Sequence, residues 1–433
     1  MFYLINIIKF QIAQIGRIFL ILPVIFIFLV NFVCYSETIV SNNITANTVW
    51  TADNSPYIII SDVSVSENAM LTIQPGVTVS FSKGRNLYIK GLLSANGDAD
   101  NKITFTGNNP SKQKGFWGAV HIEFSAKSNS SNISNAVFEC SGYNNYAPIV
   151  LDARAEANFS NIEIVNCLYS GIEIKSGVYS KNIYLKKFDL PYLVTKQLEI
   201  AENTYLEIEQ NVVLKFTQNA NLVVKGDLIA NGTSSMPIIF TSVKDDLADN
   251  IDSDCNFYST GNKFDWGGIS LINSINSSLT NVQIKYGGGS SVTQNSLLLL
   301  ENSSPIIQYT LFEESGKYGI TILNNSNPDL GSGIQNSLGM NRFSGFSQNN
   351  FAILCKSEAN ISAKKNCWGT NDASEIEKII YHYNDKNRYG KVDYSEFLED
   401  CFALPSIPVL TLPEDYSENV STSAQFVWEQ SSS

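Results

Sequence analysis

The segment Asp385–Glu396, with the sequence DKNRYGKVDYSE, has the spacing of a calcium-binding EF-hand loop. Such a loop places oxygen ligands at positions 1, 3, 5, 9 and 12 and a glycine at position 6, where the chain turns around the ion. The residues that satisfy this pattern are Asp385, Asn387, Gly390, Asp393 and Glu396. Tyr389 occupies position 5 and removes one ligand, so the meaning of the match depends on the surrounding fold.

Few other residues have types and spacing suited to acid–base chemistry. Asp152 and Arg154 share one face of an expected strand in the segment LDAR, but a surface ion pair explains them better than a polysaccharide lyase site. The adjacent Asp245 and Asp246 lie in the polar segment KDDLADNIDSD, and we expect them in a solvated loop. We therefore assign no catalytic, cofactor-binding or metal-binding residue from the sequence.

The histidines and tryptophans also have structural interpretations. His121 alternates with apolar neighbours in AVHIEF and is expected to point outward from a strand, and His382 lies in IIYHYND. Trp117 and Trp266 recur at one repeat position, which is expected of core anchors, with sugar stacking as the alternative. Exposed tyrosines such as Tyr88 could contact a glycan, but nothing in the sequence indicates which tyrosine would do so.

The composition of the 433-residue chain excludes some partners. Its formal net charge is −12 with the basic residues dispersed, which disfavours nucleic acid and anionic lipid. Hydrophobic residues make up 44%, enough for a substantial core. The cysteines outside the N-terminal leader show no CxxC pair for zinc, so we interpret them as core thiols and leave a chance disulfide open. No cofactor is expected.

Residues 1–36 are expected to form a signal peptide. A basic start precedes the apolar run Ile18–Val33, which is short for a membrane span. The small residues Cys34 and Ser36 follow it and suit cleavage after Ser36. The alternative is an uncleaved anchor. With the leader removed, we expect a secreted or cell-surface chain without membrane contact.

An internal duplication dominates the rest of the sequence. Pro56–Thr106 matches Pro191–Thr241 without a gap, and the similarity extends over 56–140 and 191–288. The second copy has a longer connection between its Thr241 and Trp266.

Short alternating segments within each copy indicate strands with one buried side. Val77, Val79 and Phe81 are typical, and the segments end at PG, KG, NG or SG corners that supply positive φ. The corner Pro75-Gly76 becomes Gln210-Asn211 in the second copy, and asparagine is the residue after glycine that best tolerates this conformation. Many further asparagines suit stacked amide ladders at the corners.

Almost no helical periodicity occurs between Ile58 and Cys367. The strands could fold back as hairpins in a sandwich or propeller, or wind forward as a solenoid. Triplets of short strands joined by bends, repeating about every 20 to 30 residues, favour a coil of β rungs over residues 46–400.

These segments resemble a known family. VWTADNSPYIIISDVSVSENAMLTIQPGVTVSF, LYIKGLLSANG, ITFTG, FWGAV and NISAKKNCWGT are similar to the right-handed parallel β-helix proteins of the pectate lyase-like superfamily, in particular secreted or surface repeat proteins of bacteria. The resemblance implies an all-β solenoid but not one function, because the superfamily holds lyases, hydrolases, adhesins and phage tailspikes.

The enzymes of this superfamily would leave a signature. They use calcium held by several carboxylates with an Arg or Lys base, or a cluster of aspartates. The hydrolase blocks Asn-Thr-Asp, Gly-Asp-Asp, Gly-His-Gly and Arg-Ile-Lys do not occur in this sequence.

The resemblance also bears on the segment Asp385–Glu396. Ile376, Ile379, Ile380 and Tyr383 stand at helical spacing before it, so a helix leads into the loop. In the resembling proteins NxWGT is followed by such a helix, a polar turn and a short strand that cover the open end of the coil. We therefore favour a cap over 368–400, with calcium binding as the alternative.

Residues 404–433 resemble the first strands of a fibronectin type III-like module, in VLTLPEDYS and AQFVWEQS. A whole module needs about 100 residues, so we expect a truncated start.

Together these features predict an exported, non-enzymatic β-helix that acts as a surface scaffold, adhesive or glycan-contacting module. The rival is a polysaccharide lyase or glycoside hydrolase. A phage or secretion-system fibre would be a stable trimer, whereas we expect a monomer. The sequence does not identify the ligand.

Overall fold

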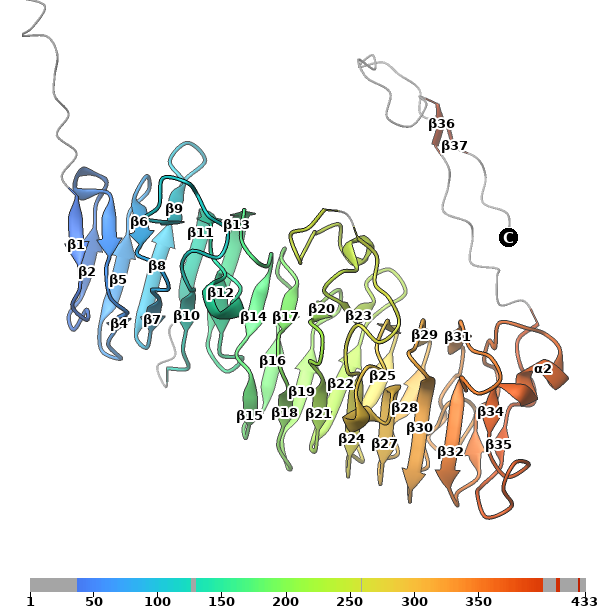
Figure 1. Ribbon diagram of the computed structural model, residues 1–433. Helices are drawn as coiled ribbons and strands as arrows, with labels where there is room; N and C mark the ends of the chain where they lie inside the picture. Colours follow the sequence, from blue (N-terminus) through green and yellow to red (C-terminus); the bar gives the residue numbers. More distant parts are fainter. Residues whose placement is uncertain (1–36, 126–129, 258, 400–409, 413–426, 429–433) are drawn as a thin grey trace, which may run out of the picture.

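Figure 1 shows the fold as a computed structural model, which describes residues 37–125, 130–257 and 259–399. It also describes the backbone of two short strands, β36 (Leu410–Leu412) and β37 (Val427–Trp428), which pair antiparallel. The predicted signal peptide and most of the predicted fibronectin-like segment lie outside the described residues. Across the described part of the chain, no helix is long and apolar enough to cross a membrane.

Every pair of named strands between β1 (Thr38–Val40) and β35 (Val392–Asp393) is parallel. Each strand lies beside the strand one turn earlier, and side chains alternate between the inside and the outside. In β5 (Met70–Ile73), for example, Leu71 and Ile73 are buried and the other two residues are partly exposed. The chain is therefore a parallel β-helix, and the sandwich and propeller alternatives are wrong.

Strands of the first part of the coil form three columns (Figure 1). The first column is β1, β3 (Tyr57–Ile59), β6 (Thr78–Phe81), β9 (Ile103–Gly107) and the second half of β11 (Ser131–Glu139). The second column is β4 (Val63–Val65), β7 (Leu87–Ile89), β10 (Val120–Ile122), β12 (Ile149–Leu151) and β14 (Ile172–Ile174). The third column is β2 (Thr48–Trp50), β5, β8 (Leu92–Asn96) and the first half of β11. β13 (Ala157–Val165) pairs along most of β11.

The second part of the coil also has three columns. The first column is β17 (Tyr192–Val194), β20 (Val213–Phe216), β23 (Ile238–Ser242), β26 (Val282–Lys285), β29 (Leu311–Glu313) and β31 (Arg342–Ser344). The second column is β15 (Gly177–Tyr179), β18 (Leu198–Ile200), β21 (Leu222–Val224), β24 (Ile269–Ile272), β27 (Ser296–Glu301), β30 (Tyr318–Asn324), β32 (Ile353–Ser357) and β34 (Ile380–Tyr381). The third column is β16 (Ile183–Leu185), β19 (Tyr205–Ile208), β22 (Asp227–Asn231), β25 (Ser278–Thr280) and β28 (Ile306–Gln308).

The second copy is displaced around the coil by one column. β3 and β17 hold equivalent positions in the duplicated sequence, yet β17 pairs with β14, the last strand of the second column. One 11-stranded sheet, the continuous sheet, therefore runs from β4 to β31 and joins the second column of the first part to the first column of the second part. Equivalent loops of the two copies consequently project from different sides of the coil.

Aromatic side chains stack in rows inside the coil. The ring centroid of Trp117 lies 4.1 Å from that of Phe81, and that of Trp266 lies 4.1 Å from that of Phe216. Both indoles are fully buried, and each donates its Nε1–H to a backbone carbonyl oxygen, at 2.6 Å and 2.7 Å. The interpretation of these tryptophans as core anchors is confirmed, and sugar stacking is wrong for both.

The cysteines of the coil are also mostly core residues. Cys140, Cys167 and Cys355 are buried, and none of them forms a disulfide. Burial raises the pKa of the Cys167 thiol to about 12 and the pKa of the Cys355 thiol to about 11, so neither ionises near neutral pH. Cys401 lies outside the described residues.

Asparagine occupies many corners of the coil, as predicted. Gly76 has φ +79° and its counterpart Asn211 has φ +65°, so the exchange between the copies preserves the corner. Amide side chains also stack between turns: Asn161 Nδ2 donates to Asn135 Oδ1 at 3.1 Å. These bonds satisfy polar groups at positions where the backbone bends.

A short helix, α2 (Ala373–Lys378), lies at the C-terminal end of the coil (Figure 1). It ends earlier than the spacing of apolar residues predicted, because Ile380 belongs to β34 and pairs with Ile353 of β32. Ile376 and Ile380 are buried, whereas Tyr383 is exposed. The chain then adds β35, which pairs with β33 (Ile361–Ser362).

Candidate functional site

The connection between β23 and β24, which we call the insertion (residues 243–268), folds back along the outside of the coil. The prediction that Asp245 and Asp246 stand in a solvated loop is wrong, because they are 1% and 0% exposed. Lys114, from a loop of the first copy, donates to the carbonyl oxygen of Cys255 at 2.7 Å. The insertion therefore connects the two copies across the junction.

The insertion covers the outer face of the continuous sheet. Glu173, Leu193, Lys215 and Thr241 are successive neighbours across β14, β17, β20 and β23, and all four are buried. Leu193 packs in a small apolar cluster with Val243 of the insertion. Outward side chains of a solenoid normally meet solvent. Here the insertion holds Lys215 and Thr241 through Asp249 and Asp245, and Val243 covers Leu193 together with Ala147 and Tyr169.

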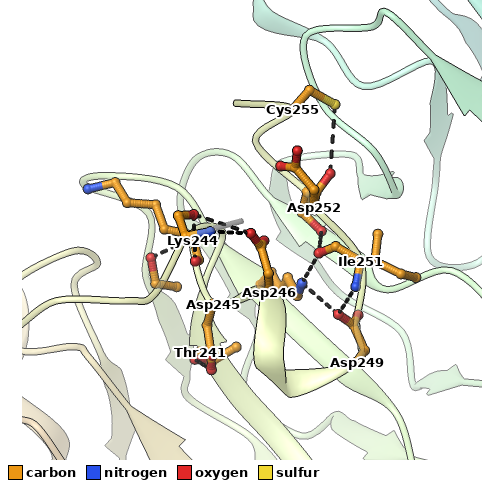
Figure 2. Close-up of polar contacts among 12 residues, drawn as sticks. Thr241, Lys244, Asp245, Asp246, Asp249, Ile251, Asp252 and Cys255 are labelled. Carbon is orange, nitrogen blue, oxygen red and sulfur yellow. Dashed lines mark hydrogen bonds and ion pairs between the residues drawn. The ribbon is translucent and has the colours of Figure 1, made fainter. Parts of the chain in front are cut away.

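Ion pairs fasten the insertion to the sheet. Lys215 is fully buried; its Nζ lies 2.7 Å from Asp249 Oδ1 and donates to the carbonyl oxygen of Ile251 at 2.8 Å. Burial raises the pKa of Asp249 more than the Lys215 ammonium lowers it. Lys285 of β26 lies 2.8 Å from Asp245 Oδ2. Asp245 and Asp249 stand at the two ends of the single 3-10 turn Asp246–Ala248 (Figure 2).

Three further carboxylates, Asp246, Asp252 and Asp254, form the aspartate cluster of the insertion. Each offers one oxygen, and these atoms lie within 4.8 Å of one another. Figure 2 shows Asp246 and Asp252 in this part of the insertion. Burial, followed by the neighbouring Asp252 carboxylate, raises the pKa of Asp254 to about 6.

A groove of about 320 Å³ lies on the outer face at the junction of the two parts of the coil. Its lining residues are Asn144, Asn145, Tyr146, Tyr169, Glu173, Thr195, Lys196, Thr217 and Gln218. The Glu173 carboxylate accepts hydrogen bonds from the backbone N–H of Ala147 at 2.9 Å and the Thr195 hydroxyl at 2.6 Å. Burial raises the pKa of Glu173 despite these bonds. The groove combines aromatic rings, amides and a carboxylate.

His121 points outward from β10, as predicted, but it is covered. Its ring stacks on Tyr88 at 4.5 Å between centroids and meets the edge of Tyr146 at 5.0 Å. Its Nε2 lies 3.2 Å from Asn86 Oδ1, an acceptor, so we place the ring proton on Nε2. Burial, with the nearby Lys175 charge, lowers the pKa of His121 to about 4.

This shift predicts a pH dependence of stability. The imidazole binds a proton at pH 6.5 when unfolded but at about 4 when folded, so the folded state loses stability as the pH falls between these values. We expect His121→Gln, which can still donate to Asn86, to remove up to about 3 kcal/mol of that loss. Urea denaturation of the wild type and of the variant at about pH 7 and pH 4 measures how much unfolding free energy each protein loses between the two pH values. Equal losses in wild type and variant would contradict the assignment.

The segment Asp385–Glu396 has the contacts of a cap rather than of an EF-hand. Asp385 Oδ2 accepts the backbone N–H of His382 at 2.9 Å, and Glu396 Oε1 lies 2.9 Å from Lys364 Nζ. Asp393 Oδ2 also lies 3.7 Å from Lys364 Nζ, so a lysine already neutralises two carboxylates of the sequence pattern, and Asp385 is directed elsewhere. This arrangement favours the cap.

The remaining sequence candidates have internal partners. His382 is fully buried, with Nδ1 accepting the backbone N–H of Val392 at 2.9 Å and Nε2 lying 3.1 Å from Glu377 Oε1. Arg154 forms a bidentate pair with Asp152, at 2.6 Å and 2.9 Å, as the ion-pair interpretation expects, although Asp152 is buried.

Comparison with known proteins supports the fold and leaves the activity open. Residues 42–175 match the family model described as a pectate-lyase like beta helix domain. No curated protein and no solved structure matches the chain. The family match, together with the parallel strand order, supports the resemblance to the pectate lyase-like superfamily.

Proposed function

We propose that the chain is an exported, non-enzymatic β-helix that contacts glycans through the groove at the junction. The observation that carries this proposal is the lining of the groove. Tyr146 and Tyr169 offer aromatic surface for a sugar ring, and the exposed Asn144, Lys196 and Gln218 offer hydrogen-bond donors around it. Export rests on the predicted leader.

Two features of the coil support a scaffold over an enzyme. The continuous sheet provides one hydrogen-bonded rod along the coil, which suits a spacer at a cell surface. Asp152 and Asp245, the candidate acids of the sequence, are each held by a basic side chain, and Glu173 accepts two hydrogen bonds. A general acid or base needs to exchange its proton with substrate. We propose a monomer, and sedimentation as a trimer would indicate a fibre instead.

Substitution in the groove is expected to weaken glycan binding. Tyr169→Ala and Gln218→Ala should each lower affinity about tenfold, because each removes contact surface or a donor, equivalent to about 1.4 kcal/mol. A panel of labelled neutral and acidic oligosaccharides provides the measurement. Tyr184→Ala, which removes an exposed tyrosine of β16 outside the groove, is the matched control. Loss of binding in the control alone would contradict the proposal.

The same polysaccharides separate the scaffold from its rival. We expect no new reducing ends and no unsaturated products from the purified chain. Turnover above that of an Asp152→Ala variant would identify a lyase or hydrolase and overturn the non-enzymatic part of the proposal.

A further inference from the structure

The aspartate cluster, Asp246, Asp252 and Asp254, is an unusual concentration of negative charge in a partly buried position. Asp246 is fully buried and the other two are half-buried, while their nearest oxygens lie within 4.8 Å of one another. Carboxylates at such separation repel one another strongly when water is excluded. Something of positive charge is needed if all three are to be ionised.

Two oxygens of the cluster have no hydrogen-bond partner. Asp246 Oδ2 accepts the backbone N–H of Ser259 at 2.6 Å, but Asp246 Oδ1 is buried and unpartnered. Asp254 Oδ2 accepts from Asn256 Nδ2 at 2.9 Å, and Asp254 Oδ1 is likewise buried and unpartnered. Buried carboxylate oxygens without a partner are costly and rare in folded proteins.

The basic side chains of this region are engaged elsewhere. Lys215, Lys244 and Lys285 each lie within 2.8 Å of a carboxylate outside the cluster. Lys114 donates to the carbonyl oxygen of Cys255. Among the residues that the structure describes, no ion pair joins a basic side chain to the aspartate cluster.

We propose that the aspartate cluster binds a calcium ion that holds the insertion against the coil. Carboxylate oxygens are the ligands that calcium prefers, at about 2.3–2.6 Å from the ion, so oxygens within 4.8 Å of one another can surround it. Water and backbone carbonyl oxygens complete the six to eight ligands that calcium takes. The site is independent of Asp385–Glu396 and of glycan binding.

Equilibrium dialysis of the full chain with calcium, after treatment with chelator, tests the proposal. We expect one bound ion per chain at about 1 mM calcium, a concentration at which extracellular calcium modules are occupied. Asp246→Asn and Asp254→Asn should each abolish binding, because each removes a charge with almost no change of shape. Asp385→Asn, in the segment with the EF-hand spacing, is the matched control and should retain the ion.

A second measurement reports on the insertion itself. Phe257 is 89% exposed, so chymotrypsin should cleave after it much faster in chelator than in calcium. The two variants should show the fast cleavage under both conditions. Circular dichroism checks that they fold, and Asp252→Asn replaces either one that does not. Absence of bound calcium in the wild type, or its retention in the cluster variants, would overturn the proposal.

Discussion

Replacement of Trp266 by alanine is expected to lower the free energy of unfolding by about 3–5 kcal/mol. The indole is fully buried, stacks on Phe216 and donates a hydrogen bond to the Lys285 carbonyl oxygen at 2.7 Å. The substitution leaves a cavity between two turns and removes the donor of a partly buried carbonyl oxygen. Urea denaturation followed by circular dichroism measures the loss.

The repeat provides matched variants for this test. Trp117→Ala should cost a similar amount, because Trp117 has the same stacking distance and the same kind of hydrogen bond in the first copy. Trp266→Phe retains the aromatic stack and should cost clearly less than Trp266→Ala. A loss below about 1 kcal/mol for Trp266→Ala would show that the indole is not a core anchor.

Replacement of Lys215 by alanine is expected to cost about 3–5 kcal/mol, because it leaves the largely buried Asp249 carboxylate, 13% exposed, without its cation. The backbone carbonyl oxygen of Ile251 also loses its donor. We expect the insertion to detach from the continuous sheet before the coil unfolds, so that protease cuts within 243–268 at low denaturant concentration. Denaturation and limited proteolysis together measure the effect.

Two control variants separate the effect of burying an ion pair from the effect of removing a charge. Lys244→Ala removes a partly exposed pair with Asp265 and should cost no more than about 1 kcal/mol. The double substitution Lys215→Met with Asp249→Asn removes both charges and should recover most of the stability lost in Lys215→Ala. If Lys215→Ala behaves like Lys244→Ala, then Lys215 does not hold the insertion in place.

The coil itself was predictable from local patterns. Alternation in segments such as Leu71 and Ile73 fixes which side of a strand is buried, and the exchange of Gly76 for Asn211 indicates a corner with positive φ. The recurrence of Trp117 and Trp266 identified the rows inside the coil. These features depend on near neighbours in the chain, so they are visible in one sequence.

The features of the site depend on contacts that the repeat does not encode. The displacement by one column is seen only in the strand pairing, because β17, the counterpart of β3, pairs with β14 of the second column. The burial of Asp245 and Asp246 results from packing of the insertion on Lys215, which is distant in sequence. Lys215 alternates with inward-facing Leu214 and Phe216, as a solvent-facing lysine would, so its burial was not predictable from the local pattern.

The early end of α2 has the same explanation. The spacing of Ile376, Ile379 and Ile380 is compatible with a helix that continues through Ile380 and also with a helix that ends before it and is followed by a strand. Pairing of Ile380 with β32 selects the second arrangement. Tertiary pairing of this kind overrides local periodicity at the ends of elements.

The junction between the copies is the centre of this account, because it builds the continuous sheet, the groove and the face that the insertion covers. Diffraction from crystals of the full chain tests it most directly. We predict that the electron density places β14 parallel to β17, with Glu173 beside Leu193 and with Leu193 packed against Val243 of the insertion. Density with β17 beside β13, or with neighbouring strands running in opposite directions, would contradict it.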